Sequence, residues 1–111
     1  MKWHIKYFSS KLEQEILALP DGLLARYLRL TDLMLEFGPN LGPPHTKSFG
    51  NALFELRIKS KEGIARVFFC TKTGRKIIML HVFTKKTQKT PKKEINIARN
   101  RMNEVTQDES L

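Results

Sequence analysis

Four cationic residues stand where they could act together on one phosphate. Arg57 and Arg66 lie inside strand-like runs, and Lys85 and Lys86 stand at the end of another such run. A charged residue in the middle of a strong strand is costly unless it is paired or faces a wet cleft, so Arg66 marks a polar patch on the predicted sheet. An ion pair with Glu55 is the alternative explanation for Arg66. Preorganised arginine and lysine side chains stabilise charge that develops on a transferring phosphate, which is the chemistry that this set suits.

Metal-dependent chemistry does not fit the same region. Chemistry through two metal ions needs clustered carboxylates, and Glu94 is the lone acid between positions 72 and 101. His4, His45 and His81 are far apart and of unlike context, so no metal site and no cofactor are predicted. Cleavage of RNA requires neither, because the adjacent 2′-hydroxyl can serve as nucleophile while the protein moves protons and neutralises charge.

His81 has two interpretations. A histidine changes its charge near neutral pH and can act as a general acid or base. Strict alternation along its strand, however, places His81 on the same face as Met79 and Phe83. That placement favours a packed core histidine over a catalytic one.

The positive charge of the chain is concentrated in one region. The formal net charge is +9, yet residues 1–41 carry equal numbers of basic and acidic residues. A concentrated basic region indicates a polyanionic partner, most commonly nucleic acid, and the alternative is a solvated basic surface. The basic residues between positions 72 and 101 are Lys72, Arg75, Lys76, Lys85, Lys86, Lys89, Lys92, Lys93, Arg99 and Arg101.

Alternating apolar and polar residues predict the strands that position these side chains. The pattern gives strands over residues 2–8, 53–59, 63–72 and 76–84. The short links at residues 60–63 and 73–75 indicate consecutive hairpins, and hence an antiparallel meander. A symmetric hairpin register would bring Arg66 close to Arg57.

Capping signals predict three helices. A capping box at Ser10 starts a short helix that ends at Pro20, and a longer apolar helical pattern then runs from residue 21 to Gly38. Thr90 and Pro91 are typical of a cap followed by the first residue of a last helix. Residues 38–51, which are rich in glycine and proline, are predicted to be a loop.

Together these elements predict an α+β fold with a small antiparallel sheet, in the order β-α-α-β-β-β-α. The N-terminal helical hairpin is expected on one face of the sheet and the C-terminal helix near the other. The 111 residues fit one domain over residues 1–105 with a polar tail at 106–111. No apolar run approaches the roughly 20 residues of a membrane span. No signal-peptide pattern occurs, and Cys70 is expected to be a small buried hydrophobe, so the protein is predicted to be soluble and cytoplasmic.

Three segments give the sequence a specific family resemblance. Residues 53–57 read LFELR, residues 65–69 read ARVFF, and residues 80–91 read LHVFTKKTQKTP. These segments, in this order of elements, closely resemble the phage-derived Gp49-like proteins, which belong with the HigB-type toxins in the RelE/ParE superfamily. The resemblance spans nearly the whole chain. It implies a compact toxin domain of a toxin–antitoxin pair, whose RelE-like relatives cut messenger RNA in the ribosomal A site.

The resemblance also implies roles for individual residues. Arg66 matches the arginine of the middle strand, Lys86 falls near the basic residue that follows the last strand, and Arg57 is expected to hold the substrate. The implied activity is that of a metal-independent, ribosome-dependent mRNA endoribonuclease that inhibits translation. The expected contacts to the RNA backbone are Lys47, Lys85, Lys89, Lys92 and Lys93.

Partners and alternatives follow from the same resemblance. The expected partners are an antitoxin with a helix-turn-helix domain (HigA-like), the ribosome and its mRNA, with no membrane. Phe68 and Phe69 stand where related toxins often carry a tyrosine, so catalysis would rely on charge rather than on a phenolic proton donor. The alternatives are a ParE-like inhibitor of gyrase without nuclease activity and an accessory nucleic-acid-binding protein, because a shared fold does not determine activity.

Overall fold

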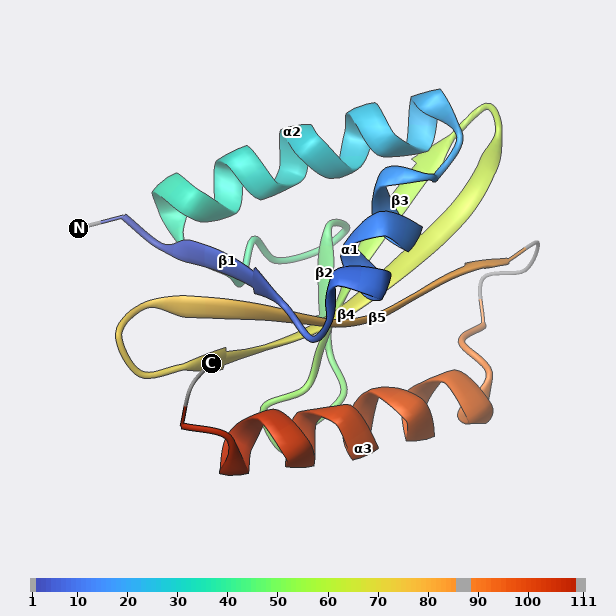
Figure 1. The fold of residues 1–111 in the computed structure, drawn as a ribbon. Helices are drawn as coiled ribbons and strands as arrows, with labels where there is room; N and C mark the ends of the chain where they lie inside the picture. Colours follow the sequence, from blue (N-terminus) through green and yellow to red (C-terminus); the bar gives the residue numbers. More distant parts are fainter. Residues whose placement is uncertain (1, 86–88, 110–111) are drawn as a thin grey trace.

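The chain folds into a five-stranded sheet with helices on both of its faces (Figure 1). The computed structural model describes residues 2–85 and 89–109. The strand order across the sheet is β1-β5-β4-β3-β2, and the predicted α+β fold is confirmed. The elements in chain order are β1 (His4–Tyr7), α1 (Ser10–Leu17), α2 (Asp21–Phe37), β2 (Thr46–Ser48), β3 (Phe54–Ser60), β4 (Gly63–Lys72), β5 (Lys76–Lys85) and α3 (Lys92–Gln107).

Two features of the sheet correct the sequence prediction. β1 pairs in parallel with β5, so the sheet is mixed rather than antiparallel throughout. The segment predicted to be a loop contains β2, which adds a fifth strand beside β3. Thr46 anchors this short strand: its Oγ1 donates to Asn40 Oδ1 at 2.9 Å and accepts from the Gly42 N–H at 2.9 Å. A strand of three residues is too short for alternation to reveal it.

The starts of two helices differ from their predicted positions by one residue. Ser9, rather than Ser10, caps α1, and its Oγ accepts a hydrogen bond from the Leu12 N–H at 3.1 Å. Pro91 is the N-cap residue of α3, whose first helical residue is Lys92. α2 ends at Gly38 as predicted, with a positive φ of 101° that favours glycine.

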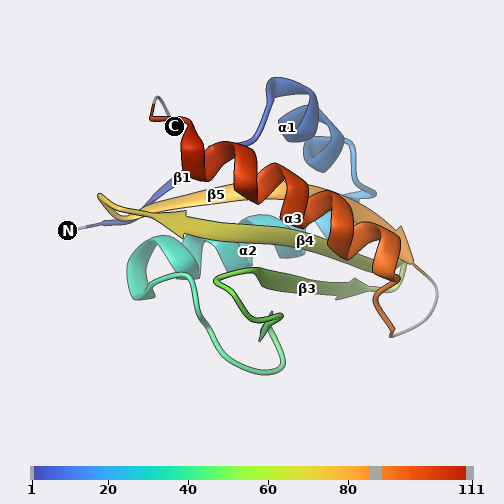
Figure 2. The same cartoon turned by 90° about the horizontal axis from the view of Figure 1, so that it is seen from below.

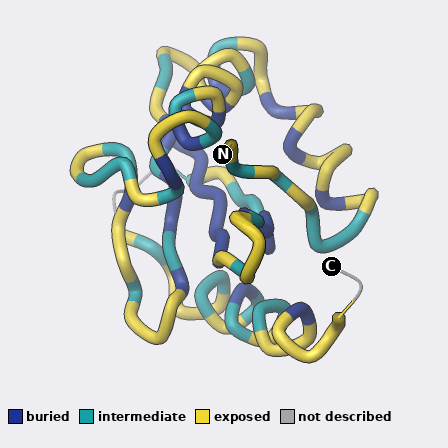
Figure 3. The backbone as a smooth tube through the Cα atoms, turned by 90° about the vertical axis from the view of Figure 1, so that its left-hand side faces the viewer, coloured by how far each residue is buried: buried dark blue, intermediate teal, exposed yellow. Residues whose placement is uncertain are grey.

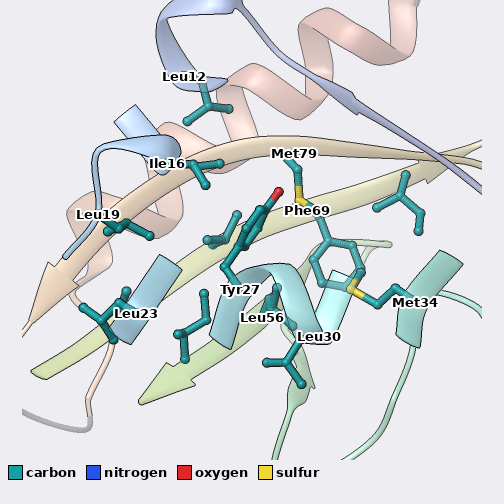
Figure 4. Packing of buried hydrophobic residues seen from close by; sticks show 14 residues of the cluster. Leu12, Ile16, Leu19, Leu23, Tyr27, Leu30, Met34, Leu56, Phe69 and Met79 are labelled. Atoms are coloured by element: carbon teal, nitrogen blue, oxygen red, sulfur yellow. The ribbon is translucent and has the colours of Figure 1, made fainter. Parts of the chain in front are cut away.

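Helices α1 and α2 cover one face of the sheet. α2 packs on β3 and β4, and α1 packs on β5 and β1. Figure 4 shows Tyr27 and Met34 from α2 among the sheet residues Phe69 and Met79. The Tyr27 hydroxyl lies 2.9 Å from that of Tyr7, and burial raises the pKa of Tyr27. Both tyrosines of the chain are therefore used in this core.

Helix α3 covers the other face, where it packs on β5 and β4 (Figure 2). Burial raises the pKa of the Cys70 thiol to about 11, as expected for a cysteine that serves as a core residue. The buried side chains between α3 and the sheet are Leu53, Phe68, Cys70, Ile78, Leu80, Ala98 and Val105. In Figure 3 the strands at the centre are largely buried, whereas the outer turns of the helices are exposed. None of the described helices has the length and apolar character needed to cross a membrane.

A bulge in β5 changes which way the second half of this strand faces. Phe68 pairs with His81 and Phe69 pairs with Met79, which leaves Leu80 as an extra residue on β5. Leu80 and His81 therefore both lie on the face that α3 covers, while Met79 packs in the core under α1 and α2. The prediction that His81 shares a face with Met79 was wrong, because alternation assumes an unbroken register.

Candidate functional site

The charged residues of the strands meet on the face of the sheet that carries α3. Strand register places Lys47 opposite Glu55 and Arg57 directly opposite Arg66. Lys85 pairs with Ile64, two residues before Arg66, and so emerges on the same face. Helix α3 packs on β4 and β5 and leaves β3 to one side, as seen in Figure 2. We call Lys47, Glu55, Arg57, Arg66 and Lys85 the basic patch.

Glu55 lies at the centre of the basic patch and has no exposed surface. Its Oε1 lies 3.3 Å from Arg57 Nε and 3.4 Å from Arg66 Nε. Its Oε2 accepts a hydrogen bond from the Thr90 hydroxyl at 2.6 Å. The ion pair between Arg66 and Glu55 that the sequence left as an alternative is therefore present. One carboxylate compensates two guanidinium groups and also fixes the segment that leads into α3.

Positive charge exceeds negative charge in the basic patch. Burial lowers the pKa of Arg66, with Glu55 opposing the shift and Arg57 adding to it. Burial also lowers the pKa of the Lys85 amino group, and Arg66 is the next largest cause. Cations that repel one another around a single acid are stabilised by a bound anion. Groups with such shifted pKa values are typical of functional sites.

A pocket of about 320 Å³ adjoins the basic patch at the edge of the sheet. It lies where β3 continues past its pairing with β2, and the Arg57 N–H donates to the His45 carbonyl at 2.8 Å at this point. Its walls come from α2, from the segment before β2, from β3 and from β4. We call it the edge pocket; it is lined by Arg26, Pro44, His45, Arg57, Lys59 and Arg66.

The structure brings some of the predicted site residues together and leaves others apart. Arg57, Arg66, Lys47 and Lys85 all belong to the basic patch. Lys47 is exposed, with its Nζ 5.1 Å from the centre of the Phe49 ring. Lys86, the second residue predicted to stabilise the reacting phosphate, lies outside the described residues. The remaining predicted RNA contacts are exposed on the approach to α3 or in its first turn: Lys89, Lys92 and Lys93.

Several basic residues of the region 72–101 have structural partners. Lys72 Nζ donates to the Val105 carbonyl near the end of α3 at 2.8 Å. Arg99 Nη2 donates to the Phe49 carbonyl at 2.7 Å. Arg75 and Arg101 lie over the rings of Trp3 and Phe8, respectively. The regional charge excess in the sequence therefore overstates the surface that is free to meet a polyanion.

His81 is packed against α3. Its Nε2 lies 2.6 Å from Glu94 Oε1, and its ring stacks on Phe83 with centroids 5.9 Å apart. The His81 side chain is 13% exposed. The interpretation of His81 as a packed side chain agrees with this environment, and His81 shares its face with Phe83 but not with Met79. In the described part of the chain, histidine, cysteine and acidic residues form no group of three that could hold a metal ion.

Only part of the site could be predicted from the sequence. Lys59 shares a strand face with Arg57, which alternation shows, but its place in a pocket depends on the neighbouring segments. Arg26 lies in α2 and reaches the edge pocket because that helix packs on β3. Thr90 matches a helix-cap signal, yet its hydroxyl binds Glu55 instead. No local pattern would have identified these two contacts.

The fold places the protein in a known structural class. A mixed five-stranded sheet with a helical hairpin on one face and a terminal helix on the other is a RelE-like α+β fold. The structure resembles a chain of the crystal structure of the archaeal RelE–RelB complex from Pyrococcus horikoshii OT3, with a TM-score of 0.55 and 16% sequence identity. The match covers 76% of this chain and 96% of that chain.

The sequence defines the family more closely. Residues 14–103 match the family of phage-derived Gp49-like proteins (DUF891). The protein belongs to this family, as the resemblance of its sequence predicted. A search of curated proteins found no match.

Proposed function

We propose that this protein is the toxin of a type II toxin–antitoxin pair and that it cleaves mRNA on the ribosome without a metal ion. Four cations, Lys47, Arg57, Arg66 and Lys85, surround a single buried carboxylate on a part of the sheet beside α3. This excess of fixed positive charge is the observation that carries the proposal. The RelE-like fold and the family membership support it.

The chemistry uses the RNA itself as the source of the nucleophile. Attack by a 2′-hydroxyl on the adjacent phosphate builds negative charge on the phosphorane, which expels the 5′-oxygen of the next nucleotide and leaves a 2′,3′-cyclic phosphate. The 2′-hydroxyl loses a proton in this step, and the leaving 5′-oxygen gains one. Arg66 and Lys86 stabilise that charge in this proposal, and Arg57 holds the substrate. Arg66 is well suited because its guanidinium is already paired with the buried Glu55 carboxylate and burial strengthens its interactions. Lys47, Lys85, Lys89, Lys92 and Lys93 bind the RNA backbone.

The proposed partners are the translating ribosome, its mRNA and an antitoxin. The archaeal structure that this fold resembles is a RelE–RelB complex, which supports an antitoxin partner. The basic patch is suited to an acidic antitoxin segment, because charge complementarity steers association and fixes register. We propose a small antitoxin with a helix-turn-helix domain, as in HigA-like proteins. Such a protein encoded beside this one, and co-purifying with it, would support the pairing.

Loss of Arg66 is expected to abolish toxicity. The Arg66→Ala variant should lower the rate of message cleavage by about 100-fold to 1,000-fold, the cost of removing one preorganised charge-stabilising donor. The measurement is message integrity after induction, by northern blot, together with growth. Arg29→Ala is the matched control, because Arg29 is exposed on α2 and outside both the patch and the edge pocket.

Three outcomes would reject the proposal. A folded, abundant Arg66→Ala protein that cuts messages as the parent does would remove this site from the reaction. Growth arrest with intact messages and an induced DNA-damage response would instead select a ParE-like inhibitor of gyrase. Harmless expression of the parent protein would favour an accessory nucleic-acid-binding role.

A further inference from the structure

The edge pocket has a strongly cationic lining. Arg26, Arg57, Lys59 and Arg66 line it, and among the residues that the structure describes no carboxylate-bearing side chain does. Glu55 lies next to Arg57 and Arg66 but is fully buried and outside the lining. A pocket walled in this way selects an anion, and the planar fork of arginine matches the oxygens of a phosphate.

The pocket is built from both sides of the sheet. Arg26 belongs to α2, which packs on the face opposite the basic patch, while Arg57 and Arg66 belong to the patch itself. These residues meet because β2 covers β3 only over residues 54–56, so the edge of β3 is open beyond Arg57. An extended ligand bound across the basic patch can therefore continue over this edge of the sheet toward α2.

The volume limits the size of the ligand. About 320 Å³ is near the lower end of the range for small-molecule sites, so the pocket suits one phosphate ester with its sugar. Arg57 is partly exposed, with a third of its side chain in solvent, and Arg66 is 3% exposed. The inner wall is therefore buried and in contact with Glu55, whereas the outer wall is open to solvent.

We propose that the edge pocket binds the phosphate of a nucleotide adjacent to the one that reacts on the basic patch, with Arg26 as its contact from α2. The RNA strand then leaves the patch over the open edge of β3. The assignment of RNA as the source of the phosphate rests on the proposed function, whereas the affinity for a nucleoside phosphate follows from the pocket alone.

The test is direct binding to the purified full-length protein. Adenosine 3′-monophosphate and inorganic phosphate are titrated separately and followed by NMR shifts of arginine Nε–H groups and by calorimetry. The parent protein and the Arg29→Ala control should bind the nucleotide, and more tightly than they bind phosphate. Arg26→Ala should weaken nucleotide binding by about tenfold, the cost of one charged hydrogen bond. Lys59→Ala gives a second variant from another element if Arg26→Ala does not fold.

Three results would overturn the inference. The first is that neither probe binds the parent protein, and the second is that the nucleotide binds no more tightly than phosphate. The third is that Arg26→Ala and Lys59→Ala bind the nucleotide as tightly as Arg29→Ala does. Message cleavage separates this inference from the proposed function. Nucleotide binding that depends on Arg26, with intact messages after induction, would reject the nuclease and retain the pocket. Message cleavage with unchanged nucleotide binding in both variants would retain the nuclease and reject the pocket.

Discussion

Glu55 determines how the two arginines of the basic patch are presented. Its carboxylate contacts Arg57 and Arg66 through one oxygen and Thr90 through the other. An arginine held by a buried carboxylate does not have to be ordered when an anion arrives, which is the condition for effective charge stabilisation. The acid also links the sheet to the segment before α3. We therefore propose that Glu55 is a positioning residue.

Replacement of Glu55 by glutamine should destabilise the fold. The substitution keeps the shape of the side chain but leaves the buried Arg66 charge without its carboxylate, at a cost of about 3 kcal/mol. Urea unfolding followed by circular dichroism measures the loss. Glu15→Gln on the exposed side of α1 is the matched control. Equal stabilities of the two variants would show that Glu55 does not compensate the arginines.

For individual residues, the sequence predicted positions in the strands better than it predicted side-chain contacts. Alternation and the hairpin links were sufficient to place Arg57 beside Arg66, since both depend on local pattern. The ion pair between Arg66 and Glu55 was only one of two explanations at the level of the sequence. A strand pattern does not show whether a charged side chain faces a solvent-filled cleft or a carboxylate. Arg26 and Thr90 reach the site through packing between elements that are distant in sequence.

The contact between β5 and α3 is the one between elements that is hardest to predict from the sequence. The bulge at Leu80 reverses the orientation of the residues that follow, and α3 stabilises it: Arg101 Nη1 donates to the Leu80 carbonyl at 2.9 Å. The same guanidinium lies 4.9 Å from the centre of the Phe8 ring. A bulge adds one residue without breaking the apolar run, so the sequence of β5 gives no sign of it. The parallel pairing of β1 with β5 was missed for a similar reason, because alternation identifies a strand but not its neighbour.

Loss of Arg101 should loosen α3 from the sheet. Arg101→Ala removes a charged hydrogen bond to a main-chain carbonyl and is expected to lower the free energy of unfolding by about 2 kcal/mol. Thermal unfolding should show a lower midpoint for this variant than for Arg29→Ala, which alters only an exposed arginine. If both variants melt with the parent, the contact at the bulge contributes nothing to docking of α3.

For the molecule as a whole, the charge of +9 has two different uses. Lys72, Arg99 and Arg101 hold main-chain carbonyls and so stabilise the packing of α3 and the segment around Phe49. The basic patch and the exposed lysines near the start of α3 make up the surface that is offered to a polyanion. Composition revealed the total charge and residue positions revealed its region, whereas the structure was needed to separate these two groups.

The exposed lysines of α3 should contribute to RNA binding through salt-dependent contacts. Lys92→Ala is expected to reduce the slope of log affinity against log salt by about 0.7, the value for one phosphate contact on a single strand. Fluorescence anisotropy with a short RNA at several salt concentrations gives the slope. Lys11→Ala, an exposed lysine on α1 over the other face, serves as the control. An unchanged slope for Lys92→Ala would remove this lysine from the RNA footprint.

Cleavage of mRNA at the basic patch through the 2′-hydroxyl can be tested by mapping the ends of messages in a reconstituted translation system, with ribosomes and without them. We expect cuts in ribosome-bound messages that leave 2′,3′-cyclic phosphate ends, and a loss of about 100-fold or more in the rate of cleavage by Arg66→Ala. Intact messages on translating ribosomes, or products with 5′-phosphate ends that do not depend on Arg66, would contradict it.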